Sequence, residues 1–216
     1  GSGVCYSSRL RPITNMRPKI QTNNPWQFMA DTHLIDWLEV KGFDVDVVTD
    51  DDLHSEGASL LAPYAAVLTA THPEYYSLAM LDSLDGFVRS GGGLMYMGGN
   101  GFYWRVAFHP DMPGVLEHRR AQQNIARWNP GVGQYFHSFT GEHGGQWWDV
   151  GRAPQLLSGI GFIAQGFDRG APYRHRPEAD DPRGHEGLAE VAGGGGEALQ
   201  TREPLAVVGV RTHLLA

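Results

Sequence analysis

Cysteine and positive charge are both scarce in this sequence. Cysteine occurs once, as Cys5, which excludes a disulfide framework or a cysteine-based zinc site within the chain and fits a reducing cytoplasm. Lys and Arg number 17 against 24 Asp and Glu, giving a formal net charge of -7. Because nucleic-acid binding needs clustered positive charge, we expect no nucleic-acid partner.

Long apolar runs are missing as well. No run approaches the roughly 20 residues that a membrane-spanning helix needs, and the first dozen residues lack the apolar segment of a signal peptide. Hydrophobic residues nevertheless make up 41% of the 216 residues, which is enough for one domain to bury a core. We therefore expect a cytoplasmic globular chain with no membrane partner.

Several common catalytic motifs are absent. The chain has no G-x-S-x-G elbow, no P-loop, no H-E-x-x-H helix and no phosphate-binding G-x-G-x-x-G after a strand. The only thiol, Cys5, lies in the segment 1–25, which is rich in Ser, Arg, Pro and Asn and predicts an extended loop. Covalent catalysis by a thiol is therefore not expected.

Residues 29–97 alternate between helical and strand periodicity. Apolar residues recur at helical spacing from Met29, and Gly42 stands where a helix-ending glycine is expected. The segments that follow are a strand over 43–49, a short helix capped by Asp50–Asp52, a strand ending near Ala70, a helix over 77–90 and a strand over 94–97. This alternation predicts an α/β domain with a doubly wound, mostly parallel sheet.

The second half of the chain is less regular. A short amphipathic helix is predicted over 115–128, and the aromatic and glycine-rich stretch 134–170 predicts an insertion packed over a sheet edge. A run of four glycines at 193–196 is typical of a linker. We expect one domain over residues 1–183 and a divergent or truncated tail over 184–216.

Two loops with polar residues follow predicted parallel strands. THPEYYS occupies 71–77 and GGNG occupies 98–101. Ligands bind beyond the carboxyl ends of the strands in open parallel sheets, so we expect these loops to be neighbours in space. His72 and Glu74 are two residues apart and would point the same way in an extended turn.

The residues of these loops have two interpretations. In the functional one, Glu74 is a hard oxygen ligand and His72 is a ligand or a general acid–base near neutral pH. In the structural one, Pro73 shapes the turn, Glu74 caps the next helix, and Tyr75 and Tyr76 cover the sheet. The glycines and Asn of GGNG fit either a turn or a clamp for a substrate amide.

A second group of ligand-type residues lies at His137, Glu142 and His143. Their spacing matches no established zinc pattern, so a structural or substrate-lining role is favoured over a metal role. His109 and His118 are expected at the surface or behind a site rather than as ligands.

Several long segments, in order, resemble the large (beta) subunit of the N,N-dimethylformamidase family over residues 1–183. They are 4–18 (VCYSSRLRPITNMRP), 31–57, 67–82, 90–110 and 135–168. The resemblance implies a class I glutamine amidotransferase-like fold whose first strand would precede Gly1. It also implies hydrolysis of a small tertiary amide such as N,N-dimethylformamide to formate and dimethylamine, a small helical partner subunit and a homo-oligomer.

The same resemblance implies a mononuclear non-haem ferric iron held by two tyrosines and one glutamate. On the matching positions, Glu74 is the carboxylate ligand, His72 the proton donor and Asn100 a pocket residue. Tyr6 is one tyrosine ligand, and the other would lie upstream of Gly1. Tyr75 and Tyr76 are not the metal-bound tyrosines under this alignment.

Two further hypotheses stay open. The chain could be a non-catalytic amidotransferase-like domain that binds a small ligand or a partner subunit, since Gly98, Gly99 and Asn100 stand where a nucleophile would follow its strand. It could also be a zinc hydrolase that uses His72, Glu74 and the group at 137–143.

Overall fold

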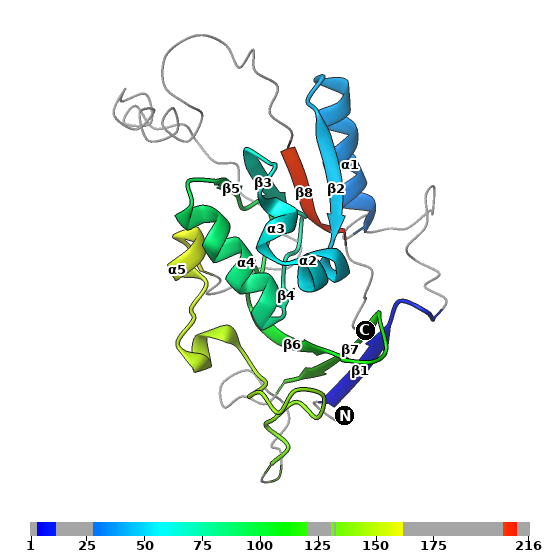
Figure 1. The fold of residues 1–216 in the computed structure, drawn as a ribbon, viewed down its shortest axis with the longest axis vertical. Coiled ribbons are helices and arrows are strands. Elements are labelled where there is room, and N and C mark those ends of the chain that lie inside the picture. The colour runs from blue at the N-terminus through cyan, green and yellow to red at the C-terminus, as the bar shows by residue number, and fades with distance from the viewer. Residues whose placement is uncertain (1–3, 12–27, 121–130, 132, 162–204, 211–216) are drawn as a thin grey trace, which may run out of the picture.

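The computed structural model describes residues 4–11, 28–120, 131, 133–161 and 205–210. These residues form two four-stranded sheets, one parallel and one mixed (Figure 1). The expected α/β class with a parallel sheet is confirmed, whereas the mixed sheet was not expected. Among the described helices, none has the length and hydropathy needed to cross a membrane.

The parallel sheet has the strand order β2-β8-β3-β5. Its strands are β2 (Val45–Thr49), β8 (Leu205–Val210), β3 (Ala66–Thr69) and β5 (Gly93–Met95). All neighbouring pairs in this sheet are parallel. Strand β8 lies within the stretch 184–216, and its Ala206 and Val207 are buried in the core.

Helix α1 (Phe28–Val40) packs on one face of this sheet. Its buried Leu38 meets Leu68 and Val207 in a small apolar cluster. Gly42 follows the helix with φ 76°, a conformation that favours glycine, and its amide donates to the Glu39 carbonyl. The predicted helix and its stop signal are confirmed.

Three helices cover the other face of the parallel sheet (Figure 1). They are α2 (Asp50–Glu56), α3 (Ala58–Leu61) and α4 (Leu78–Arg89). Buried side chains of these helices share one core with residues of both sheets, so the helices lie between them. Thr49 caps α2 with the help of Asp52, and Ser77 caps α4. The helix-capping role expected for Glu74 is therefore filled by Ser77.

The mixed sheet has the strand order β1-β7-β6-β4. Its strands are β1 (Val4–Ser8), β7 (Val115–Arg119), β6 (Trp104–Phe108) and β4 (Tyr75–Tyr76). β7 pairs antiparallel with both β1 and β6, and β4 pairs parallel with β6. Two predictions are wrong here, the loop over residues 4–8 and the helix over 115–119, because both segments find strand partners far away in sequence.

Residues 133–161 form the irregular region that we expected. They contain a 3-10 helix η1 (Trp147–Val150) and a short helix α5 (Gln155–Ser158). Hydrogen bonds join this region to β6 and β7, for example from Arg105 to the Gly145 carbonyl. The remainder of the helix predicted over 115–128 and the glycine run at 193–196 lie outside the described residues.

Candidate functional site

The two polar loops lie side by side, as predicted. The Gly99 amide donates to the Thr71 carbonyl at 3.2 Å, and the Phe102 amide donates to the Pro73 carbonyl at 2.7 Å. A Cβ atom at Gly98 would stand 2.0 Å from the Thr71 carbonyl oxygen, so only glycine fits this approach. The loops after β3 and β5 therefore pack directly against each other.

His72 and Glu74 form a pair at this junction. The distance from His72 Nε2 to Glu74 Oε2 is 3.6 Å, and the two side chains are 15% and 13% exposed. The Glu74 amide donates to the His72 carbonyl at 2.8 Å, a tight turn around Pro73 that directs both side chains to one side. The expected common direction of His72 and Glu74 is confirmed.

Asn100 lies in the loop 98–101 and has an unusual backbone conformation. Its φ is 53°, in the left-handed region that Asn tolerates better than most residues. Its Oδ1 is buried and, within the described part of the chain, accepts no hydrogen bond. The neighbouring Gly99 is close enough to His72 that an added Cβ would stand 3.5 Å from its Cε1. The buried oxygen is a ready acceptor for a ligand or a water molecule.

Tyr6 lies elsewhere. It belongs to β1, at the opposite edge of the mixed sheet from β4, which directly follows Glu74. Its side chain is 57% exposed, its ring packs against Phe139 at 5.5 Å, and its hydroxyl is 3.3 Å from Ser138 Oγ. With three strand spacings of about 4.8 Å between β1 and β4, this structure does not bring Tyr6 to the His72–Glu74 pair.

Tyr75 and Tyr76 take part in packing. The Tyr75 hydroxyl accepts a hydrogen bond from Arg120, and its ring meets His118 edge-on at 5.0 Å. Tyr76 is buried and meets Phe102 at 5.0 Å. Both rings are therefore used by the mixed sheet and its surroundings, in agreement with the expectation that they cover a sheet.

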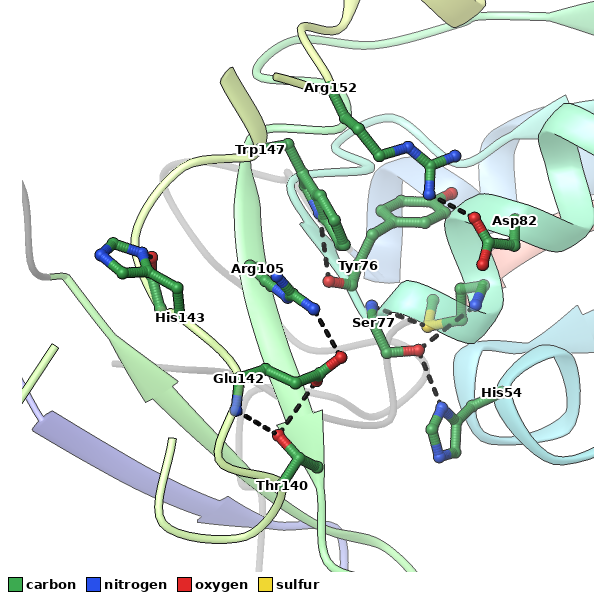
Figure 2. Close-up of polar contacts among 12 residues, drawn as sticks. His54, Tyr76, Ser77, Asp82, Arg105, Thr140, Glu142, His143, Trp147 and Arg152 are labelled. Carbon is green, nitrogen blue, oxygen red and sulfur yellow. Dashed lines mark hydrogen bonds and ion pairs between the residues drawn. The ribbon is translucent and has the colours of Figure 1, made fainter. Parts of the chain in front are cut away.

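The second group of ligand-type residues forms part of a cluster of buried charges. We call Arg105, Glu117, Arg119, His137 and Glu142 the ion-pair cluster. Glu142 pairs with Arg105, and the fully buried Glu117 pairs with Arg119. Figure 2 shows the Glu142 carboxylate directed at Arg105 and Thr140, and His143 lying apart from them.

His137 is buried within the ion-pair cluster as a neutral ring. Burial lowers the pKa of His137 to about 4, and nearby carboxylates and guanidinium groups act on it in opposite directions. Burial also lowers the pKa of His118 to about 3. His118 is fully buried against Trp104 and Tyr75, so the expectation of a surface position is wrong for it.

No zinc site is formed by these residues. Across the described ranges, no group of three or more His, Cys, Asp or Glu side chains is arranged to hold a metal ion. His72 and Glu74 lie at the loop junction, while His137 and Glu142 are held within the ion-pair cluster. The described residues therefore lend the zinc-hydrolase hypothesis no metal site.

A serine–histidine contact that sequence reasoning missed is structural. His54 Nδ1 lies 2.8 Å from Ser77 Oγ, which also accepts the Met80 amide at 3.3 Å (Figure 2). Ser77 is buried and caps α4, and burial lowers the pKa of His54. The serine oxygen therefore stabilises the start of a helix rather than offering an exposed nucleophile.

Comparison with known proteins confirms the family that the sequence resembles. Residues 1–203 match the family described as N,N-dimethylformamidase beta subunit-like, C-terminal. Because the match covers most of its length, the chain belongs to this family.

Two relatives carry the same name. The chain is 40% identical over 185 residues to the N,N-dimethylformamidase beta subunit of Paracoccus aminophilus, and equally so to that of an Alcaligenes species. The aligned part is 85% of this chain and 24% of each relative. The chain thus spans about a quarter of the length of the curated relatives it matches.

Proposed function

We propose that this chain carries the hydrolytic site of an amide hydrolase that acts on a small tertiary amide such as N,N-dimethylformamide. The products are formate and dimethylamine. The observation that supports this most directly is the His72–Glu74 pair, held where the loop 71–77 packs on the loop 98–101, which contains Asn100 and its buried oxygen. Its place beyond the carboxyl ends of parallel strands is typical of ligand sites in α/β proteins.

Hydrolysis of an amide requires that the leaving nitrogen receives a proton. In hydrolysis, a C–O bond forms between water and the formyl carbon, the C–N bond breaks, the amine nitrogen takes up a proton from His72, and a proton that the water loses returns to His72. Protonated His72 is the donor for that nitrogen, and the Glu74 carboxylate 3.6 Å away orients and stabilises the imidazolium ring. The protein therefore keeps donor and carboxylate together before substrate arrives.

Asn100 supplies polar contacts to the reacting groups. Its Oδ1, buried and with no hydrogen bond from the described residues, accepts a hydrogen bond from the attacking water or from His72 Nε2–H. Its side-chain NH2 donates to the oxygen that becomes negatively charged as the tetrahedral intermediate forms. This double role needs the left-handed backbone that turns Asn100 at φ 53°.

The iron that the family resemblance implies is only partly matched by these residues. Glu74 is a hard oxygen donor beside His72, as a ferric ligand would be. Tyr6 lies at the other edge of the mixed sheet, so Tyr6 and Glu74 do not converge on one ion in this structure. We keep a mononuclear ferric iron as the proposed cofactor on the resemblance alone, and no step above runs through it.

The resemblance also supports proposals about assembly. The names of both relatives describe a beta subunit, so we propose a partner subunit for this chain, small and helical, within a homo-oligomeric cytoplasmic enzyme. We further propose the class I glutamine amidotransferase-like version of the α/β fold. The mass of the native complex, measured by light scattering, tests the assembly directly.

A glutamate substitution tests the proposed function. In the intact enzyme, Glu74→Gln should lower the rate of dimethylformamide hydrolysis by about 10²–10⁴-fold, measured as release of formate and dimethylamine. The melting temperature should stay within a few degrees. Glu56→Gln, at an exposed position on α2, is the matched control and should keep the full rate. Full turnover by Glu74→Gln would refute the proposal.

A further inference from the structure

Asp31 is a buried carboxylate whose hydrogen bonds reach across the fold. It lies in the first turn of α1 and is only 1% exposed. Its Oδ1 accepts hydrogen bonds from the Thr71 amide at 2.8 Å and from the Thr71 hydroxyl at 2.6 Å. A buried carboxylate is costly unless its hydrogen bonds compensate for lost water, so this contact has a substantial structural effect.

Thr71 is the point at which three parts of the fold meet. Both of its donors are used by Asp31, and its carbonyl accepts the Gly99 amide at 3.2 Å. It directly precedes His72, and Gly99 directly precedes Asn100. Any shift of Thr71 therefore moves the histidine and the asparagine relative to each other.

The neighbouring contacts leave little freedom for compensation. Gly98 packs so closely on Thr71 that no Cβ fits, and the Met97 amide donates to Thr69 Oγ1 at 2.9 Å. These contacts join both loops to the end of β3. From the helix side, a single carboxylate oxygen of Asp31 binds both donors of Thr71 and ties these loops to α1.

We propose that Asp31 is a positioning residue for amide hydrolysis, which holds Thr71 so that the His72–Glu74 pair and Asn100 keep a productive geometry. This inference rests on the proposed function of that pair. In this proposal Asp31 acts through its two hydrogen bonds to Thr71. Small displacements of catalytic groups cost large factors in rate, even when binding of the substrate is kept.

The first test separates positioning from stability. In the intact enzyme, Asp31→Asn should lower kcat about 10–100-fold and leave KM for dimethylformamide within threefold. The melting temperature, followed by circular dichroism, should fall by only a few degrees, because the Asn oxygen can still accept both hydrogen bonds, although more weakly than a carboxylate does. An unchanged kcat would overturn the proposal, as would a rate loss fully explained by the fraction of unfolded enzyme at the assay temperature.

The second test uses the partner residue. Thr71→Val removes the hydroxyl and keeps the amide, so kcat should fall, and Thr71→Ser should restore most of the rate by returning the donor. Thr32→Val is the matched control, because the exposed Thr32 hydroxyl donates to the Met29 carbonyl of the same helix. Equal rates in the Val and Ser variants at position 71 would overturn the proposal.

The outcomes distinguish this inference from the proposed function. If Glu74→Gln is inactive while Asp31→Asn and Thr71→Val keep full kcat, the positioning role is refuted and the function stands. If Glu74→Gln keeps full turnover, the proposed function fails first, and the positioning role fails with it.

Discussion

The His72–Glu74 pair and the ion-pair cluster use the same residue types for different ends. In the cluster, each carboxylate that we describe is paired with a guanidinium: Glu117 with Arg119 and Glu142 with Arg105. At the loop junction, histidine and carboxylate are 3.6 Å apart, beyond an ordinary hydrogen bond, and both keep some exposure. The carboxylate therefore faces a histidine at the junction, whereas it faces a guanidinium in the cluster.

The two regions also differ in how their backbone is fixed. The loop junction is held by backbone hydrogen bonds between its two loops, by a glycine that permits close approach, and by the side chains of Thr69 and Thr71. The residues 133–145 over the mixed sheet are held by backbone hydrogen bonds at Gly145 and also by charged side chains, for example by Ser138 on Glu117 and Arg119 on the Gln134 carbonyl. We therefore expect substitutions in the cluster to change stability and substitutions at the junction to change turnover.

The largest expected change in stability follows from opening the buried pair. Arg119→Met leaves the fully buried Glu117 without its cation and should lower the free energy of unfolding by about 3–5 kcal/mol. Arg89→Met, which opens the exposed pair with Asp85, should cost at most about 1 kcal/mol. Urea unfolding of both variants measures the contrast, and equal losses would contradict a structural role for the cluster.

Acid should weaken the same region through its buried histidines. Folding lowers the pKa of His137 to about 4 and of His118 to about 3, below the usual value of 6.5, so the unfolded chain binds these protons first. Their contribution is complete above about pH 6.5 and is lost as the pH falls toward 4, by about 1.4 kcal/mol per pH unit for each ring.

Substitution of His137 isolates the contribution of one buried histidine to this pH dependence. His137→Gln should reduce the pH dependence of the free energy of unfolding between pH 6.5 and 4, measured by urea titrations at fixed pH. His33→Gln, at an exposed position of α1, should leave that dependence as it is. A His137→Gln profile parallel to the parent's would show that folding does not change the pKa of His137.

Substitutions at Gly98 and at a control glycine test how the backbone of the loop junction is fixed. Gly98→Ala should force the loops apart, because its Cβ would stand 2.0 Å from the Thr71 carbonyl oxygen, and should lower kcat about tenfold or more. Turnover assays and the melting temperature of the intact enzyme check whether the rate falls more than the stability explains. A Gly98→Ala enzyme with the parent rate would mean that close approach of the loops is not needed.

The smallest expected effect is that of a substitution at Gly86, the control for Gly98. Gly86 lies within α4, and an added Cβ there meets no atom within 4 Å. Gly86→Ala should therefore stabilise the protein by about 0.5–1 kcal/mol through higher helix propensity, with no change in turnover. A loss of activity in this variant would show that the assay responds to helix changes far from the junction.

Local patterns predicted one part of this fold well. The helices α1 and α4 follow from apolar residues at helical spacing and from glycine and serine at their ends. The proximity of the loops at 71–74 and 98–101 follows from a general property of parallel sheets. These predictions needed only short-range signals and one rule of topology.

Features that depend on distant partners were missed. The charged strand Val115–Arg119 has helix-like composition, and its pairing with β1 and β6 decides its conformation. The apolar, β-branched run at 205–210 was a strand signal, but its place at the centre of the sheet depends on segments more than 130 residues away. The contact between Asp31 and Thr71 spans 40 residues and has no local pattern at all.

The most direct test of the proposed site is a double-mutant cycle in the intact enzyme. His72→Gln, Glu74→Gln and the double variant are compared by kcat/KM for dimethylformamide, with the melting temperature as the check on folding. If the pair acts as a unit, the double variant should lose no more than the more damaging single variant. Losses that multiply would show that the two residues act independently and would contradict the account.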